Sequence, residues 1–213
     1  MLSIAHRHWA PGPRAARAPA GAIDVWWADL TAVEDELEQL LCAEERERAA
    51  RIVQARDRVL WSRSRGVLRA LLGRYLDRDP HTLEFALGAH GKPALRERAR
   101  LIAEGPGGDL RFNMSHSGTL ALYAITAGRE VGVDIERARE RYTPEFLHAW
   151  VAREAAGKCR GTGLRRGSGL ATSQAAPSQD ELWTAELDVG PDAAGAVAVE
   201  GEPCELRCWE WRV

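Results

Sequence analysis

Two carboxylates stand one residue apart in a segment that has the alternation of a β-strand. In residues 130–136 (EVGVDIE), apolar residues alternate with Gly132, Asp134 and Glu136. Alternate strand residues share a face, so the side chains of Asp134 and Glu136 point the same way. At ~4 Å they would repel by ~4 kcal/mol at an effective dielectric of 20, and by ~1 kcal/mol in water. A bound cation would relieve this repulsion; a polar strand face open to water is the alternative.

A second charged pair lies on the helix predicted from Pro144 to about Arg160. Glu154 and Lys158 are four residues apart and therefore share a helix face. As an exposed salt bridge, the pair would contribute only about 0.3 kcal/mol. As a functional pair, Glu154 would complete a metal site with the strand carboxylates, and Lys158 would contact a phosphate oxygen. Hard oxygen ligands with no His or Cys nearby favour magnesium.

A polar segment, Ser115 to Gly118, is predicted to form a bend between two strands. There the hydroxyls, the backbone N–H groups and the His116 imidazole would cradle a phosphate, although a lone His in a turn is often incidental. Ser115 as a nucleophile activated by His116 is disfavoured, because adjacent strand residues point to opposite faces.

Arginines are concentrated between Glu44 and Arg74, where nine of them stand against four acids. Either a solvated helix face or an anion site accounts for this local excess of positive charge. The chain as a whole has a net charge of −2, which argues against a general nucleic-acid binder.

The elements that must position these residues follow from periodicity and turn signals. Residues 23–30 predict a buried strand, and Thr31 with Glu34 predicts a capping box before a short helix. Helical spacing of apolar residues runs from Arg56 to Asp77. Further strands are predicted at 83–87, 110–113, 120–126, 130–136, 182–188, 196–200 and 205–211. Residues 88–93 are predicted to form a loop that presents Lys92, and residues 165–180 a mobile loop.

This order of elements predicts an α+β (α/β) fold of two similar halves, each a small antiparallel sheet with a long helix. We expect a flexible N-terminal arm over residues 1–22, one half over 23–128, and a second half over 129–213 that carries the metal site. No segment has the length and apolarity of a signal peptide or a membrane span, which favours a cytoplasmic protein. The four scattered cysteines are expected to be reduced packing residues.

Taken in chain order, these segments resemble the surfactin-synthetase-activating type of 4′-phosphopantetheinyl transferase. The resemblance runs from about Ile23 to the C-terminus, and the order of its motifs makes it specific. The matching motifs are Gly91-Lys92-Pro93, residues 112–117 (FNMSHS), residues 131–136 (VGVDIE), residues 150–155 (WVAREA) and residues 158–164 (KCRGTGL).

The resemblance implies a holo-acyl-carrier-protein synthase that transfers 4′-phosphopantetheine from coenzyme A to a serine of an apo acyl or peptidyl carrier protein, releasing 3′,5′-ADP. The carrier would belong to fatty-acid, polyketide or nonribosomal peptide biosynthesis. The fold would be a pseudo-twofold monomer with coenzyme A between its halves, without nucleic-acid or membrane partners. By the same resemblance, Asp134, Glu136 and Glu154 would hold Mg²⁺. Because the attacking serine needs a base, Glu154 is the candidate base, either directly or through a metal-bound water. The contacts to coenzyme A would come from Arg48, Lys92, Ser115, His116 and Lys158.

The connection between Glu136 and Trp150 is shorter than is usual in that family. Only thirteen residues intervene (137–149), and a helix-sized segment is missing. The seven residues before Pro144 reach ~23 Å when extended, so the helix that bears Glu154 can return to the strand. Two alternatives stay open: a degenerate family member that binds coenzyme A or a carrier without turnover, and an unrelated α+β module whose arginines bind an anionic partner.

Overall fold

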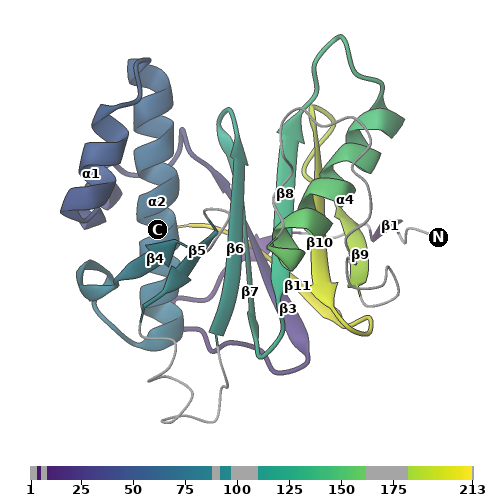
Figure 1. The fold of residues 1–213 in the computed structure, drawn as a ribbon, viewed down its shortest axis with the longest axis horizontal. Coiled ribbons are helices and arrows are strands. Elements are labelled where there is room, and N and C mark those ends of the chain that lie inside the picture. Colours follow the sequence, from purple (N-terminus) through teal and green to yellow (C-terminus); the bar gives the residue numbers. More distant parts are fainter. Residues whose placement is uncertain (1–3, 6–8, 88–91, 97–109, 162–181, 213) are drawn as a thin grey trace, which may run out of the picture.

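The computed structural model describes residues 4–5, 9–87, 92–96, 110–161 and 182–212. Its fold is α+β, as predicted (Figure 1). The helical elements are a 3₁₀ helix η1 (Asp35–Leu40), α1 (Ala43–Ala50), α2 (Ala55–Leu76), a second 3₁₀ helix η2 (Pro80–Thr82) and α4 (Pro144–Arg160). The strands are β1 (Ile4–Ala5), β2 (Ala10–Pro11), β3 (Ala22–Asp29), β4 (Phe85–Leu87), β5 (Pro93–Leu95), β6 (Leu110–Ser117), β7 (Leu120–Ala127), β8 (Val131–Arg137), β9 (Leu182–Leu187), β10 (Ala193–Glu200) and β11 (Glu205–Glu210).

The strands form two larger sheets and one small hairpin. The four-stranded sheet has the order β1-β9-β10-β8, and the five-stranded sheet has the order β2-β11-β3-β7-β6. Most neighbours are antiparallel, whereas β1 with β9, β2 with β11 and β11 with β3 are parallel. Strands β4 and β5 pair with each other. β8 and β6 are therefore each the last strand of a sheet.

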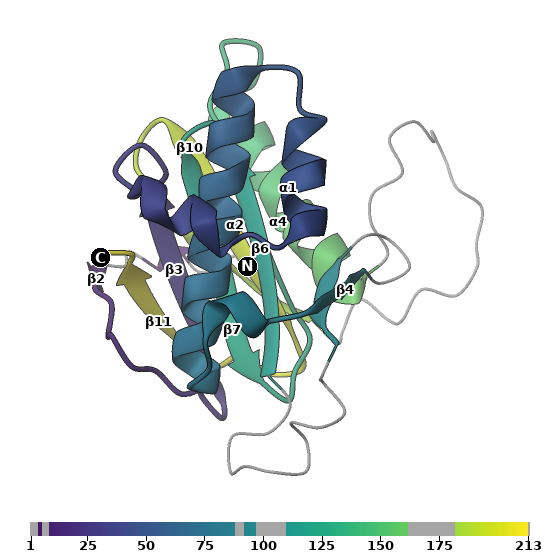
Figure 2. The ribbon, with the colours of Figure 1, turned by 90° about the vertical axis from the view of Figure 1, so that its left-hand side faces the viewer.

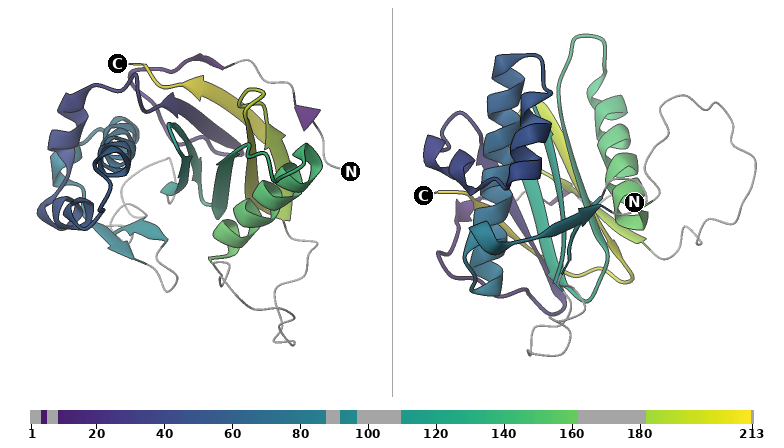
Figure 3. Two further views of the ribbon diagram at one scale, coloured as in Figure 1. Left: turned by 90° about the horizontal axis from the view of Figure 1, so that it is seen from above. Right: turned by 60° about the vertical axis from the view of Figure 1, so that its left-hand side comes forward.

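The two larger sheets pack face to face between two helical layers, as the view from above shows (Figure 3). One core lies between the sheets and includes Val25, Leu122 and Val133. A second core joins the five-stranded sheet to α2, which crosses that sheet in Figure 2. The third core packs α4 on the alanine-rich strand β10. The order of layers is thus helix, sheet, sheet, helix.

Strand β11 returns from the far end of the chain to pair with β3. The carboxylate of Asp24, on β3, is only 2% exposed and fixes this pairing. It accepts hydrogen bonds from Arg207 (2.6 and 3.0 Å), the Trp209 indole (3.0 Å) and the Tyr75 hydroxyl (2.5 Å). Four donors compensate for the desolvation of one charge. Burial and the neighbouring Asp24 carboxylate raise the pKa of Tyr75, so its hydroxyl stays protonated as the donor.

Several predicted elements are confirmed within one to three residues. The strand at 23–30 is β3, the helix at 56–77 is α2, and the helix from Pro144 to Arg160 is α4. Gly161 ends α4 in the left-handed region, with φ of 67°. The strands predicted at 120–126, 130–136, 182–188, 196–200 and 205–211 are β7 to β11.

Two local predictions are wrong. Thr31 and Glu34 form no capping box: η1 begins at Asp35 without a side-chain cap, and the Thr31 hydroxyl donates instead to Asp29 (2.8 Å). Ser115 to Ser117 form no bend either, because β6 runs straight to Ser117 and only Gly118 and Thr119 make the turn. The strand persists because its backbone pairs with β7 and its hydroxyls find partners on β8.

The boundaries at 22/23 and 128/129, and the pseudo-twofold relation of the halves, stay predictions. Within the predicted arm, β1 and β2 add two-residue pairings to the sheets, and within the second half β11 belongs to the sheet of the first. The mobile loop predicted at 165–180 lies outside the described residues. In the described ranges no helix combines the length and apolarity that crossing a membrane requires. The four cysteines are free, as expected.

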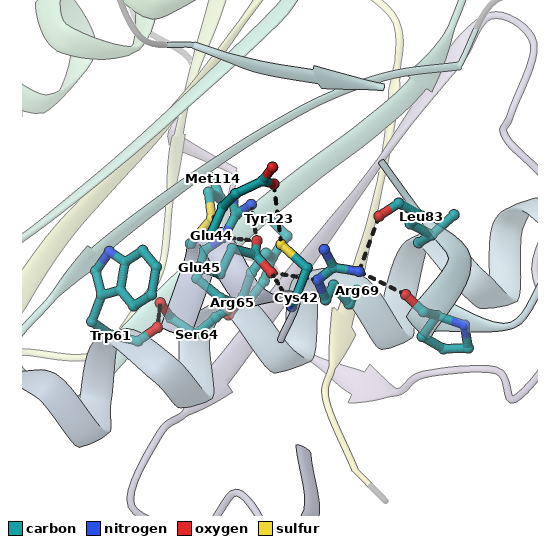
Figure 4. Close-up of polar contacts among 11 residues, drawn as sticks. Cys42, Glu44, Glu45, Trp61, Ser64, Arg65, Arg69, Leu83, Met114 and Tyr123 are labelled. Carbon is teal, nitrogen blue, oxygen red and sulfur yellow. Dashed lines mark hydrogen bonds and ion pairs between the residues drawn. The ribbon is translucent and has the colours of Figure 1, made fainter. Parts of the chain in front are cut away.

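Two arginines of the arginine-rich region, Arg65 and Arg69, are buried inside the fold (Figure 4), whereas five others are exposed. Glu45, at the start of α1, binds Arg65 at 2.5 Å and Arg69 at 2.6 Å, and Arg69 is completely buried. Both guanidinium groups also lie over the Phe85 ring, at 4.8 and 5.0 Å from its centre. Burial raises the pKa of Glu45, but the two arginines outweigh burial and hold the pKa below its ordinary value. These two arginines thus belong neither to a solvated face nor to an open anion site.

Glu45→Gln keeps the side-chain size but removes the charge that Arg69 needs, so we expect a loss of about 3 kcal/mol of unfolding free energy at pH 7. Because the folded-state pKa of Glu45 is lowered, its contribution is present above the ordinary carboxyl pKa and is lost as the pH falls through the lowered value. Urea unfolding from pH 7 to pH 3 should therefore show the difference between wild type and variant shrinking on the acid side.

The matched control is Glu84→Gln. Glu84 is 68% exposed and lies 3.8 Å from Arg96, which is also exposed. Its removal should change stability by less than about 0.5 kcal/mol at any pH in this range. Equal stability of wild type and Glu45→Gln at pH 7 would contradict the assigned role of Glu45.

Candidate active site

The candidate site is built on the free edge of β8. One side of β8 pairs with β10, which leaves outward-facing backbone groups on the other side without a strand partner. Side chains take the place of that strand. The amide of Asn113 accepts the Val133 N–H (2.9 Å), and the Ser117 hydroxyl accepts the Arg137 N–H (3.1 Å). An edge strand whose polar groups are satisfied in this way stays open to side chains and ligands.

Lys158, Ser115 and Asp134 meet at this edge. The Lys158 ammonium donates to Asp134 Oδ1 (2.6 Å), to the Ser115 hydroxyl (2.8 Å) and to the Val133 carbonyl (3.2 Å). The Ser115 hydroxyl in turn donates to the same Asp134 oxygen at 2.8 Å. Asp134 is 5% exposed, so its charge is compensated by this ammonium rather than by water. Three residues from β6, β8 and α4 therefore form one connected polar cluster.

Glu136 makes a second, separate link between β6 and β8. Its carboxylate accepts the Ser117 hydroxyl at 2.8 Å. Glu136 is half-buried and follows Asp134 by two residues on the same strand face. The strand prediction that both carboxylates point the same way agrees with their two serine partners, which are also two residues apart on β6.

Gly132 allows α4 to lie close to the carboxylate face of β8. A Cβ atom at Gly132 would come within 2.1 Å of the Ala155 carbonyl oxygen and 2.4 Å of the Cys159 nitrogen. Both atoms belong to the helix backbone, which cannot move aside locally. The absence of a side chain at Gly132 is therefore what brings Lys158 within reach of Asp134.

Glu154 lies one helical turn before Lys158 and is half-buried. Burial raises its pKa first, and the Asp134 carboxylate raises it further. Lys158 and Arg153 lower the pKa, and Glu136 adds a smaller upward contribution, but the pKa stays above its ordinary value. Glu154 thus experiences the field of both strand carboxylates.

The three carboxylates do not converge into a preassembled metal cage. In the part of the chain that the structure describes, no three His, Cys, Asp or Glu side chains are grouped so that they could hold a metal ion. The physical reason is visible in their partners, since Asp134 is ion-paired with Lys158 and Glu136 is hydrogen-bonded to Ser117. Lys158 provides the positive charge at Asp134.

His116 lies on β6 beside this cluster. The alternation of the strand directs its ring to the face opposite Ser115, which agrees with the sequence argument against a serine nucleophile. Its side chain is exposed, yet neighbouring protein groups partly desolvate it, and this lowers the pKa of His116; Lys158 lowers it further. Asp57 and Glu136 act in the opposite direction without reversing the shift. The imidazole is therefore neutral at pH 7 and acts as a hydrogen-bonding group.

Lys92 lies at the start of the β8 edge, whereas Arg48 lies apart from it. The Lys92 ammonium donates to Glu130 (2.9 Å) and to the Val131 carbonyl (3.0 Å), and Arg111 pairs with the same Glu130. Arg48 is on α1, with its guanidinium 5.7 Å from the centre of the Trp61 ring. Of the predicted site residues, Ser115, Asp134 and Lys158 contact one another. Glu154 and Glu136 lie beside this cluster. Arg48 belongs to the opposite helical layer.

Sequence reasoning assigned no role to Asn113 or Glu130, and it gave Ser117 only a possible phosphate contact in the expected bend. Asn113 and Ser117 hold the edge of β8, and Glu130 anchors Lys92. A signal was present for the first two: Asn113, Ser115 and Ser117 recur at every second position, which is the period of one strand face. The expected bend at Ser115 hid this period.

Comparisons with known proteins point to one family. Residues 27–128 match the family described as 4′-phosphopantetheinyl transferase, N-terminal. The chain is 28% identical to "4′-phosphopantetheinyl transferase HetI" from Nostoc sp. (strain PCC 7120 / SAG 25.82 / UTEX 2576), and the match covers 95% of this chain and 98% of that protein. It is 30% identical to "Putative 4′-phosphopantetheinyl transferase slr0495" from Synechocystis sp. (strain ATCC 27184 / PCC 6803 / Kazusa), over 60% of each chain.

The match to HetI spans all the residues at the β8 edge, and the family match runs from the last three residues of β3 through β7. By both kinds of comparison the chain is similar to 4′-phosphopantetheinyl transferases.

Proposed function

We propose that this protein transfers 4′-phosphopantetheine from coenzyme A to a serine hydroxyl of an apo acyl or peptidyl carrier protein and releases 3′,5′-ADP, with Mg²⁺ required. We further propose that the protein is of the surfactin-synthetase-activating type, that it is a cytoplasmic monomer, and that it has no nucleic-acid partner. It is supported by the names of the similar proteins and by the chemistry gathered at the β8 edge. One observation carries it: the Lys158 ammonium lies 2.6 Å from Asp134 and 2.8 Å from Ser115, in the field of two further carboxylates.

The cluster suits a diphosphate that arrives with a divalent cation. Asp134, Glu136 and Glu154 would hold Mg²⁺, and their mutual repulsion, which contributes to the raised pKa of Glu154, is the kind of cost that a bound cation relieves. When bound, the ion would neutralise charge on the diphosphate. The cation would share Asp134 with Lys158, so a donor of Lys158 would become available to a phosphate oxygen.

The reaction forms one bond and breaks one. The oxygen of the carrier serine attacks the phosphorus that bears pantetheine, and the bond from that phosphorus to the oxygen of 3′,5′-ADP breaks. The serine proton would go to Glu154, the carboxylate that α4 places beside Asp134 and Lys158. Lys158 compensates the charge that develops on the departing phosphate.

The remaining contacts to coenzyme A are assigned by position. Ser115 lies next to Lys158 and would donate to a phosphate oxygen, and the neutral His116 would donate a further hydrogen bond. Lys92 would add positive charge at the other end of the β8 edge, where it already contacts the Val131 carbonyl. Arg48, exposed on α1, would reach coenzyme A from the opposite helical layer.

Asp134→Asn tests the transfer itself. We expect wild-type protein, coenzyme A and Mg²⁺ to give an apo carrier protein the mass of one 4′-phosphopantetheine, detected by intact-protein mass spectrometry. The variant should reduce kcat at least a hundredfold, because it removes a metal-binding charge and the ion-pair partner of Lys158. The control is Glu205→Gln, which changes an exposed carboxylate on β11 and should leave the rate unchanged.

Wild-type protein that modifies none of several carriers but still binds coenzyme A would indicate a binding protein without turnover. Full activity of Asp134→Asn would contradict the assignment of the β8 edge as the reacting site.

Lys158→Met tests the phosphate contact without turnover. Methionine keeps an unbranched side chain and removes the ammonium, so the dissociation constant for coenzyme A should rise about tenfold, as expected for the loss of one charge-assisted contact. Isothermal titration calorimetry with coenzyme A measures this. Arg160→Met, two residues further along α4, is the matched control and should bind as wild type does. An unchanged affinity of Lys158→Met would remove Lys158 from the proposed coenzyme A site.

A further inference from the structure

Ser117, the last residue of β6, links this strand to two consecutive residues of β8. Its side-chain oxygen accepts the backbone N–H of Arg137 at 3.1 Å, and its hydroxyl donates to Glu136 Oε2 at 2.8 Å. Ser117 is 9% exposed, so protein groups rather than bulk water surround the hydroxyl. The two hydrogen bonds therefore determine how the Ser117 side chain is oriented.

The direction of both hydrogen bonds follows from the chemistry of the groups. A backbone N–H is a donor only and an ionised carboxylate is an acceptor only, whereas a serine hydroxyl has a single proton and can also accept. The Ser117 oxygen must therefore accept from Arg137, and its proton must point to Glu136. The backbone of β8 thus orients the hydroxyl, and the hydroxyl in turn orients the carboxylate.

Glu136 needs such a partner more than a shorter residue would. Its side chain has several rotatable bonds and is half-buried at the β8 edge. Ordering a long side chain costs conformational entropy, and this cost weakens binding whenever the ligand has to do the ordering. A hydrogen bond that holds the carboxylate removes part of the cost, which is how a supporting residue improves a binding site.

The pair Ser115 and Asp134 has the same arrangement two residues earlier on each strand. The Ser115 hydroxyl accepts from the Lys158 ammonium at 2.8 Å and donates to Asp134 Oδ1 at 2.8 Å. The two pairs differ in charge, because Lys158 also donates to Asp134 directly at 2.6 Å, whereas Ser117 is an uncharged donor. Ser117 holds Glu136 without neutralising it, so the negative charge of Glu136 stays available to a cation.

The turn after β6 directs the neighbouring Arg137 away from Glu136. Gly118 has a φ of 57°, and a Cβ atom there would come within 2.9 Å of the Arg137 Cδ. The Arg137 guanidinium donates to the Thr119 hydroxyl at 3.4 Å. Since neighbouring strand residues point to opposite faces, Arg137 lies along the turn and Glu136 shares the face of Asp134.

We propose that Ser117 is the positioning residue for Glu136 in the proposed metal site and holds its carboxylate on the strand face where a divalent cation would bind with coenzyme A. This inference rests on the proposed function, because it requires Glu136 to be a metal ligand. Ser117 contacts neither the cation nor the substrate and acts through Glu136. Strand β6 of one sheet thus supports a carboxylate on β8 of the other.

A phosphate contact is the other role open to Ser117. A phosphate oxygen would have to take the Ser117 proton from Glu136, and the two negative groups would then face each other. Ser115 differs, because the Lys158 ammonium lies 2.8 Å from its hydroxyl and would compensate the charge of a phosphate. The charges at the two serines therefore favour a phosphate at Ser115 and a carboxylate-positioning role for Ser117.

The test uses Ser117→Ala in the full chain, with Mn²⁺ as the probe and with coenzyme A but no carrier protein, so that no turnover occurs. We expect the dissociation constant for Mn²⁺ to rise about tenfold, as for the loss of one hydrogen bond to a charged group. Electron paramagnetic resonance of the free ion measures this. The affinity for coenzyme A, titrated calorimetrically in EDTA, should change less than about twofold, because Lys158 and Ser115 are untouched.

Two control variants accompany this measurement. Ser117→Thr keeps the hydroxyl and should bind Mn²⁺ within about twofold of wild type. Thr31→Ala removes an exposed hydroxyl that donates to Asp29 at the same distance of 2.8 Å, and it should change neither affinity.

A purely structural role of Ser117 predicts a different pattern. If the hydroxyl only held the edge of β8, its loss would also loosen Asp134 and Lys158, and the affinity for coenzyme A in EDTA would fall in parallel with that for Mn²⁺. Such a parallel fall, or an unchanged Mn²⁺ affinity of Ser117→Ala, would overturn the role of Ser117 alone. Wild-type protein that binds coenzyme A but no Mn²⁺ would instead overturn the metal site of the proposed function.

Discussion

The open edge of β8 is the constraint on which the rest of the site depends. A sheet edge exposes N–H and C=O groups that must find partners, and here side chains from β6, α4 and Lys92 supply them. Two of these side chains, Lys158 and Lys92, are also among the proposed contacts to coenzyme A. Because Lys158 contacts a backbone carbonyl and Asp134 at once, its ammonium is held in place before any ligand arrives. The cluster that closes a gap between two sheets is thus the cluster that we propose binds diphosphate.

The two faces of β8 pack against different parts of the fold, because alternate residues of the strand point to opposite sides. Val131, Val133 and Ile135 fill the core between the sheets, whereas the opposite face accepts the backbone of α4 at Gly132 and places its carboxylates beside the helix. The packing of α4 therefore determines the spacing of the reacting groups. The short connection before Pro144 does not prevent this approach, because the contact is made by the second half of the helix.

Periodicity predicted the long helices, most strands and the shared face of Asp134 and Glu136, because each of these depends on local patterns. Periodicity could not predict the partners of the charged residues. Ion pairing of Glu45 with two buried arginines joins residues 20 and 24 positions apart, and the bond from Lys158 to Ser115 spans 43. Residue type alone could not show that Lys158 already neutralises Asp134, or that Ser115 to Ser117 continue a strand instead of forming a bend.

The pairing of β11 with β3 has a consequence for how the chain folds during its synthesis. Arg207 must reach Asp24 across 183 residues, and at ~5–20 residues per second a ribosome needs on the order of ten to forty seconds to make that stretch. During this time the Asp24 carboxylate and one edge of β3 lack their final partners, while β7 can already pair with the other edge and α2 can cover one face of the strand. The five-stranded sheet is therefore completed late, and the nascent chain carries an exposed strand edge of the kind that chaperones protect.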